Sequence, residues 1–305
     1  MASDSVMRKI ELKHGKANAS VTVVPFGATI ISWKVDDHEH IFVSKTAIMD
    51  GSKAIRGGVP VCFPNFGPWN LGPQHGFARN SKDWQVTSEP KVDINSGDVE
   101  LTLVLKDNEE TKKMWNAQFT FQYQITLKAS AVHLKVDVKN DGTENIDMTY
   151  CFHTYFTTSD LNAVQVTDLK GLTYTDKTIE GWPTKEETND IVEIKGFTDR
   201  VRHKIALLMR FVSHNRITFT LQVYAKAPND IKVHGMANGR TLKLNKTGLA
   251  DWVVWNPYET AAKMSDMHEN GHLEFVCVEA TQTSDRIIIN PGSNWQATHT
   301  MEISE

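Results

Sequence analysis

Short runs in which apolar and polar residues alternate, separated by turns rich in Gly, Pro and Asn, constrain the fold of this chain most. In the clearest run, 132–139, the residues Val132, Leu134, Val136 and Val138 share one face, and an Asn-Asp-Gly turn follows. Successive side chains of a strand point to opposite faces, so a period of two is typical of a half-buried β-strand. A helix of this composition would instead show a period near 3.6.

Similar runs recur along the chain and predict further strands at residues 19–24, 29–35, 98–105, 119–128, 273–279 and 285–289. A short helix is expected only over 108–115, with Asp107 or Asn108 as its N-cap. Many closely spaced strands and few helices predict an all-β protein, a large antiparallel β-sandwich. The sequence contains neither an internal repeat nor a low-complexity linker, so we expect residues 1–305 to form a single domain.

Composition narrows the functional classes. Hydrophobic residues make up 40% and charged residues 23%, as in soluble globular proteins, and a net charge of −4 gives no reason to expect a nucleic-acid or membrane partner. No signal peptide or long apolar stretch is evident, and the three cysteines form no framework for disulfides or metal binding. These features predict a cytoplasmic protein with free thiols, and a monomer by default.

A first polar and aromatic cluster spans 56–64 and 74–79. It is rich in Gly and Pro, which is typical of irregular loops, and loops on a rigid β-scaffold often carry binding sites. Its residues Arg56, His75 and Arg79 could bind an anion and hydroxyl groups, because guanidinium groups match phosphate oxygens well. Surface ion pairs of the two arginines are an alternative of similar weight.

The second cluster, residues 151–156, places His153 within an aromatic strand. Such a histidine is more often a hydrogen-bonded core residue than a catalytic one. Glu279 ends an apolar run, where its carboxylate either reaches solvent or is held in a desolvated pocket. Considered alone, neither residue identifies a catalytic site.

Taken together, these segments resemble the aldose 1-epimerase family, in particular its hexose-6-phosphate mutarotases. The resemblance spans about residues 8 to 302, and the segments that carry it are RGGVP (56–60), PQHGFAR (73–79), FHTYF (152–156), VWNP (254–257) and CVE (277–279). It implies the galactose-mutarotase type of β-sandwich. It also implies interconversion of the α and β anomers of a sugar by acid/base ring opening and closure, with neither a metal nor a cofactor.

The same resemblance implies the roles of individual residues. Glu279 would be the base toward O1 and His153 the acid toward O5, with the roles exchanged on ring closure, and the pKa of His153 would have to lie near neutrality. His75 would hydrogen-bond a sugar hydroxyl or the developing charge. The remaining substrate-binding positions would be Arg56, Gln74, Arg79 and Asp199, with the two arginines suited to a phosphate. Trp255 could offer a stacking face, although tryptophans at loop ends more often pack at a rim.

Residues 201–223 depart from the family pattern. This segment is basic and apolar and contains no acidic residue. Deleting 201–222 or 202–223 restores the family's Asp-Arg-Val-Tyr, so one hypothesis is a retained intron that is translated. The rival hypothesis is a genuine basic insertion that projects from the surface as a loop near Asp199.

Three functions compete at this point. The leading one is a glucose-6-phosphate 1-epimerase, and the alternative enzyme is a mutarotase of neutral aldoses such as galactose. Arg56 and Arg79 favour the phosphate, because a neutral sugar offers no counter-charge to two desolvated guanidinium groups. The third, a non-catalytic carbohydrate-binding protein, would not need both His153 and Glu279.

Overall fold

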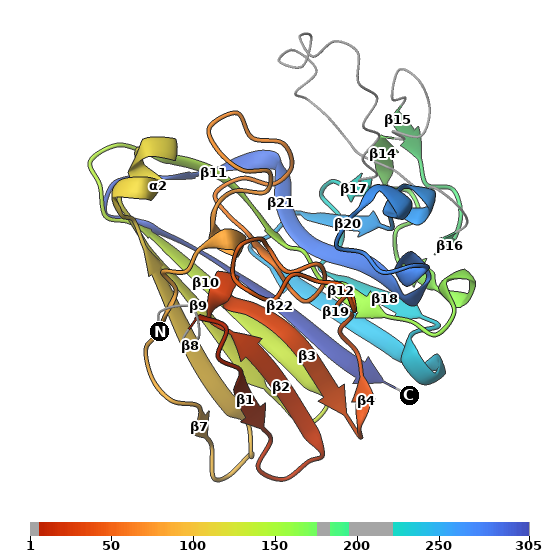
Figure 1. The fold of residues 1–305 in the computed structure, drawn as a ribbon. Coiled ribbons are helices and arrows are strands. Elements are labelled where there is room, and N and C mark those ends of the chain that lie inside the picture. The colour runs from red at the N-terminus through yellow and green to blue at the C-terminus, as the bar shows by residue number, and fades with distance from the viewer. Residues whose placement is uncertain (1–5, 176–183, 195–221, 305) are drawn as a thin grey trace.

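The computed structural model describes residues 6–175, 184–194 and 222–304, and layered antiparallel sheets dominate them (Figure 1). This confirms the predicted all-β class and the β-sandwich. In the described part of the chain, no helix has the length and apolar character needed to span a bilayer.

The largest sheet has ten strands, and all of its pairings are antiparallel. Its strands are β6 (Gln85–Val86), β7 (Lys91–Val92), β8 (Val99–Lys106), β9 (Phe119–Leu127), β10 (Ala131–Asn140), β13 (Gln165–Thr167), β16 (Ile191–Glu193), β18 (Asp230–His234), β19 (Thr241–Thr247) and β22 (Asn294–Ser304). Its long central strands alternate buried and more exposed residues, as the period of two predicted.

A six-stranded sheet packs against one face of the large sheet. Its strands are β5 (Val61–Cys62), β11 (Ile146–Phe152), β12 (Tyr155–Thr157), β17 (Gln222–Tyr224), β20 (Asp251–Trp255) and β21 (Phe275–Ile289). The inner face carries Phe152, Trp252 and Val278, which belong to the main core shared with the large sheet. The outer face has a second core of its own, in which Cys62, Cys151, Val253, Trp255 and Cys277 take part.

Two smaller sheets and a few short helices complete the described structure. The four-stranded sheet contains β1 (Ile10–Lys13), β2 (Ala19–Val24), β3 (Thr29–Val35) and β4 (His38–Glu39), and the two-stranded sheet contains β14 (Thr173–Thr175) and β15 (Thr184–Glu186). The helices are α2 (Glu109–Met114) and the short 3₁₀ turns η1 (Phe26–Ala28), η2 (Ala78–Asn80), η3 (Leu161–Ala163), η4 (Ala237–Gly239), η5 (Tyr258–Lys263) and η6 (Gly271–Glu274).

Most of the elements that the sequence predicted lie where local signals placed them. The cap of α2 is Asn108, whose side chain accepts hydrogen bonds from the backbone N–H groups of Glu110 and Thr111, so the structure decides between the two predicted caps. The expectation of separate strands at 273–279 and 285–289 is wrong, because β21 is continuous over 15 residues. Asp251 accepts hydrogen bonds from the backbone N–H groups of Thr283 and Ser284 at 2.8 and 2.7 Å, which supports the polar middle of that strand.

Most of the anomalous segment, residues 201–221, lies outside the described residues, as does Asp199. Its last two residues, Gln222 and Val223, open β17 and pair with β20. The chain therefore re-enters the six-stranded sheet immediately before Tyr224. The hypotheses for this segment, and the single-domain organisation, stay predictions.

Candidate active site

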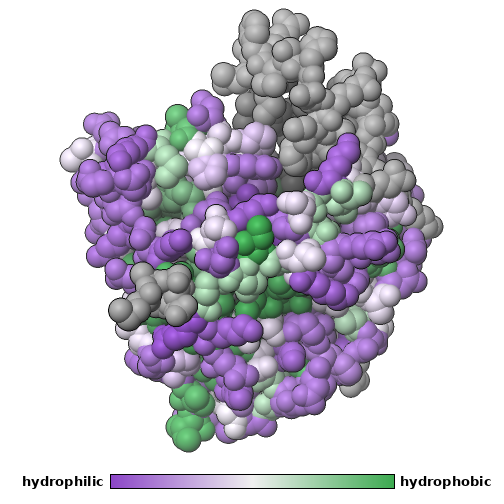
Figure 2. Space-filling model, in the orientation of Figure 1, coloured by the Kyte–Doolittle hydropathy of each residue, from purple (hydrophilic) through white to green (hydrophobic). Residues whose placement is uncertain are grey.

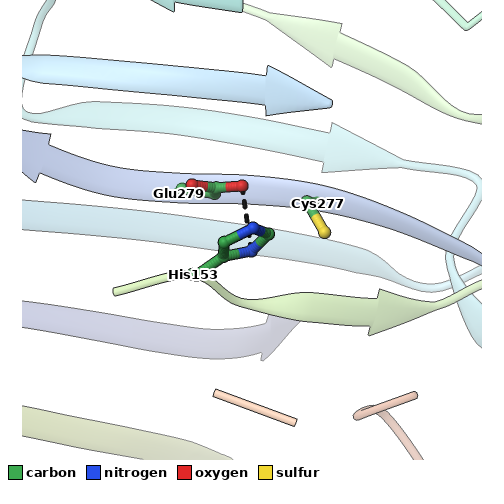
Figure 3. Close-up of side chains that lie close together, drawn as sticks. All are labelled: His153, Cys277 and Glu279. Carbon is green, nitrogen blue, oxygen red and sulfur yellow. Dashed lines mark ion pairs between the residues drawn. The ribbon is translucent and has the colours of Figure 1, made fainter. Parts of the chain in front are cut away.

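The centre of the candidate site is an interruption between two strands. β11 ends at Phe152 and β12 begins at Tyr155, and both pair with β21, through Ala280 and Cys277 respectively. The interruption therefore places His153 beside the stretch of β21 that carries Glu279. Figure 3 shows Glu279 and Cys277 on one strand and His153 reaching toward them from the neighbouring segment.

His153 and Glu279 form a close, buried pair. The distance from His153 Nδ1 to Glu279 Oε1 is 3.0 Å, and the side chains are 7% and 0% exposed. The two atoms do not have the mutual orientation of a hydrogen bond, and neither has another hydrogen-bond partner within the described residues. A buried polar atom without a partner is costly, so both atoms are suited to interact with a polar substrate.

Burial shifts the proton affinities of the pair in opposite directions. Desolvation raises the pKa of Glu279 well above its usual value and lowers the pKa of His153 well below its own. The positive charges of Arg79 and Arg56 lower the pKa of His153 further. Both groups thus favour their neutral forms, whereas the acid role implied by the resemblance requires a near-neutral pKa of His153.

Aromatic rings fix the orientation of His153. Tyr155 stacks on its ring at 4.9 Å with an interplanar angle of 7°, and Trp255 approaches edge-on at 5.6 Å. Trp255 is only 7% exposed and belongs to the second core, so it packs against His153 and does not lie at the rim of a loop. The imidazole therefore has few alternative rotamers.

His75 also packs against His153, with their ring centroids 5.5 Å apart and an interplanar angle of 70°. Its Nδ1 accepts a hydrogen bond from the backbone N–H of Gly67 at 3.2 Å, so the neutral ring carries its hydrogen on Nε2. Burial, together with the charges of Arg79, His153 and Arg56, holds the pKa of His75 well below its usual value. A neutral imidazole with a fixed N–H is a suitable donor to a sugar oxygen.

Arg56 is anchored by a buried carboxylate. Its Nε and NH2 donate to Asp266 Oδ1 and Oδ2 at 3.0 and 3.5 Å, and its NH1 lies 3.5 Å from the hydroxyl of Tyr155. Lys53 Nζ lies 2.7 Å from the same carboxylate, whose side chain is 1% exposed. Burial would raise the pKa of Asp266, but Lys53 and Arg56 hold it below its usual value. Two cations therefore share one anion.

The approach of the Arg56 loop depends on glycine. Gly57 has φ = 118°, and a Cβ at this position would lie 2.4 Å from the carbonyl oxygen of Phe42. Only glycine combines that backbone conformation with so close an approach. The loop segment between β4 and β6, orange in Figure 1, lies against the sheet that contains β11 and β21.

Arg79 comes from η2, at the end of the same loop. Its NH2 donates to the carbonyl oxygen of Gln74 at 2.9 Å, and its buried Nε has no hydrogen-bond partner within the described residues. The charge of Arg79 is felt by His75, His153 and Glu279, as their shifted pKa values show. An unpartnered guanidinium N–H near this site is available to an anionic ligand.

Comparison with known proteins decides the family. The model of the aldose 1-epimerase family matches residues 8–302. The chain belongs to the aldose 1-epimerase family. It is 30% identical over 299 residues to a protein of Cenchrus ciliaris named "Putative glucose-6-phosphate 1-epimerase", covering 96% of this chain and 83% of the relative. A protein of Escherichia coli K12 with the same name is 30% identical over 281 residues, covering 90% and 83%.

Solved structures agree with this membership of the aldose 1-epimerase family. A crystal structure titled as a "putative mutarotase" from Salmonella typhimurium is 25% identical and has a TM-score of 0.77, covering 94% of this chain and 88% of that one. A galactose mutarotase-like protein from Clostridium acetobutylicum is 15% identical with a TM-score of 0.66, covering 96% and 94%, and shows the same fold. The implied fold is thereby confirmed, and the protein is an isomerase of the epimerase class.

For this aldose 1-epimerase, the structure brings together four of the residues that the sequence singled out. Direct contacts, or contacts through one intervening residue, link His153, Glu279, His75 and Arg56. Arg79 and Gln74 lie on the adjoining loop. Asp199 lies outside the described residues.

Sequence reasoning missed Asp266 and the contact of Cys151 with Glu279. Asp266 stands in a segment without regular periodicity, so no pattern could have revealed it. The sequence indicates Cys151 only as one of three free thiols, although its position two residues before His153 on an apolar strand is a usable signal.

Among the described residues, one group could bring three metal-ligating atoms within 4.8 Å of one another, namely His153, Cys277 and Glu279. Glu279 Oε2 already accepts a hydrogen bond from Cys151 Sγ at 3.0 Å. Divalent-metal binding needs deprotonated ligands. The neutral side chains of His153 and Cys277 beside the buried acid Glu279 therefore suit proton transfer better than metal binding. We therefore interpret the group as an acid/base pair with a neighbouring thiol.

Proposed function

We propose that this aldose 1-epimerase interconverts the α and β anomers of hexose 6-phosphates, with glucose 6-phosphate as the leading substrate. The observation that carries the proposal is the buried pair of His153 and Glu279, with Nδ1 and Oε1 3.0 Å apart, in the electrostatic reach of Arg56 and Arg79. The names of the relatives from Cenchrus ciliaris and Escherichia coli support the same substrate.

In the proposed reaction the less favoured, ionised form of the pair is the active one: the carboxylate of Glu279 removes the proton of the C1 hydroxyl while the imidazolium of His153 protonates the ring oxygen. The bond between C1 and O5 breaks, C1 rotates in the open aldehyde, and closure on the other face reverses both proton transfers. An acid and a base within one pair can exchange roles in this way, since each ends the cycle in its starting protonation state. His75 Nε2–H would stabilise charge that develops on a sugar oxygen.

A phosphate on the substrate would also change the pKa of the proposed acid, His153. The charges of Arg79 and Arg56 add to burial in lowering the pKa of His153. A bound phosphate dianion would compensate both positive charges and so raise the pKa of His153 toward the range that protonation of O5 requires. A neutral sugar would leave these charges uncompensated. Substrate charge would thus contribute to turnover as well as to binding.

A mutarotase of neutral aldoses such as galactose is the second candidate. It is favoured by the engagement of Arg56 with Asp266, which neutralises part of the guanidinium charge. Lys53 also lies on Asp266, however, so this cluster of two cations and one carboxylate keeps a net positive charge. That balance, together with the unpartnered Nε of Arg79, supports the phosphate.

The deciding experiment compares the anomerisation of freshly dissolved α-glucose 6-phosphate and α-galactose, with the uncatalysed rates subtracted. We expect faster catalysis on the phosphate, and loss of most of that preference in Arg56→Gln. The matched control is Arg240→Gln, since Arg240 pairs with Asp36 on the surface. Preference for galactose by the unsubstituted protein would reject the phosphate proposal, and no catalysis on either sugar would favour a carbohydrate-binding role.

The same proposal includes a monomeric, cytoplasmic protein whose partner is the small-molecule substrate. The surface in Figure 2 is mostly hydrophilic on the face shown, which suits a monomer. Size-exclusion chromatography with light scattering should give a mass near 34.4 kDa.

A further inference from the structure

The second carboxylate oxygen of Glu279 has a partner that the reaction does not require. Cys151 Sγ donates to Glu279 Oε2 at 3.0 Å, and both side chains are completely buried. Cys151 comes from β11 and Glu279 from β21, which are paired neighbours in the six-stranded sheet. The contact is therefore set by the pairing of two strands and is independent of the loops that carry Arg56 and Arg79.

The two oxygens of Glu279 face different groups. Oε1 lies beside His153 Nδ1, whereas Oε2 faces the thiol. A carboxylate held at one oxygen cannot rotate freely about its Cγ–Cδ bond, so the other oxygen keeps its direction. Water would not serve this purpose at a position where both partners are fully buried.

We propose that Cys151 is a positioning residue that holds Glu279 Oε1 toward the substrate and stabilises the carboxylate form needed for proton abstraction. This inference rests on the proposed catalytic role of Glu279. A thiol is a weaker hydrogen-bond donor than a hydroxyl. Cys151 therefore orients the carboxylate of Glu279 and still leaves it able to accept a proton.

The surroundings explain why such a donor matters. Among the described residues, the titratable and charged groups that face Glu279 are Cys151 on β11, His153, Tyr155 on β12, Cys62 on β5, Cys277 on its own strand and Arg79. Burial raises the pKa of Glu279, while the hydrogen bond from Cys151 and the charge of Arg79 lower it. Without Cys151, the charge of Arg79 would be the influence among the described residues that still lowers the pKa of Glu279.

The test compares Cys151→Ala with Cys151→Ser by measuring kcat/KM for α-glucose 6-phosphate as a function of pH. Cys151→Ala should move the acid limb of the profile upward by about one pH unit, because the carboxylate loses a donor. Cys151→Ser keeps a donor and should restore the limb to its original position or below. Val254→Ala is the matched control, because it removes a fully buried side chain from the inner face of the same sheet, away from Glu279, and should leave the acid limb in place.

A second measurement is independent of turnover. The Glu279 carboxyl carbon, assigned by its loss in Glu279→Gln, can be titrated by ¹³C NMR in the unsubstituted protein and in both Cys151 variants. A higher pKa in Cys151→Ala, with folding confirmed by the melting temperature, supports the inference. An unchanged pKa and an unchanged acid limb would overturn it. Full activity of Glu279→Gln would instead reject the proposed function of Glu279, whatever the titration shows.

Discussion

The ten-stranded and six-stranded sheets share one core but differ in what covers their other faces. In β10 of the large sheet, buried residues alternate with half-exposed ones over most of the strand. In β20 of the smaller sheet, all five residues are buried, because loops and the second core cover its outer face. The large sheet thus has a solvated face, whereas the part of the smaller sheet around β20 has none.

This difference governs the chemistry of the polar side chains. His133 lies on the outer face of the large sheet, is half-buried, and makes a hydrogen bond with Thr300 Oγ1 at 2.8 Å. His153 lies under the loops that cover the smaller sheet, and its pKa is lowered far more strongly. A covered outer face desolvates an acid/base pair, which is what a catalytic site requires and a structural sheet does not.

The largest expected effect contrasts these two histidines. His153→Gln should lower kcat/KM by roughly two to four orders of magnitude, because it removes a proton-transfer group. His133→Gln should lower it less than about twofold. Initial rates on α-glucose 6-phosphate at matched melting temperatures check this, and a similar loss in both variants would contradict the contrast.

The next effect should appear in stability alone. Leu134 is fully buried in β10 on the face shared with the smaller sheet. Leu134→Ala should lower the free energy of unfolding by about 4 kcal/mol, from lost burial and the cavity left behind. Urea titration gives that value, and kcat/KM below the midpoint should stay unchanged. A large loss of activity in the folded variant would show that the sheets are not independent.

A third effect concerns pH and the interface between the sheets. Burial lowers the pKa of His299 to about 4, and its ring packs on Phe152 and Trp252. Between pH 6.5 and 4 the unfolded chain binds a proton that the folded protein does not, so the free energy of unfolding should fall by up to about 3 kcal/mol as the pH drops through this window. Urea titrations across it should show a shallower fall in His299→Leu, and an unchanged slope would contradict the assignment.

The smallest expected change in the free energy of unfolding concerns the helix at one end of the large sheet. Asn108 caps α2, between β8 and β9, and Asn108→Ala should lower the free energy of unfolding by about 1 kcal/mol. Asn108→Ser should recover most of that loss, because serine is also a good cap. Thermal unfolding of both variants measures the difference, and equal melting temperatures would indicate that the helix end contributes no stability.

The sequence by itself determined three long strands of the large sheet, β8, β9 and β10, and limited the cap of the helix to Asp107 or Asn108, because periodicity and local hydrogen bonding are properties of neighbouring residues. It was less successful for β21, whose polar middle resembles the end of one strand and the start of another. There the continuity depends on Asp251, which is distant in sequence. The candidate residues His153, Glu279, His75 and Arg56 were identified from motifs, but their roles could not be judged from each motif alone.

Only the tertiary structure decided how those residues meet. The 3.0 Å approach of His153 to Glu279, the thiol of Cys151 on Glu279 and the hold of Asp266 on Arg56 join segments that are 126, 128 and 210 residues apart in the chain. The electrostatic state of the pair follows from desolvation by several loops and two sheets at once. Desolvation is a sum over everything that surrounds a group, so no local pattern of residues encodes it.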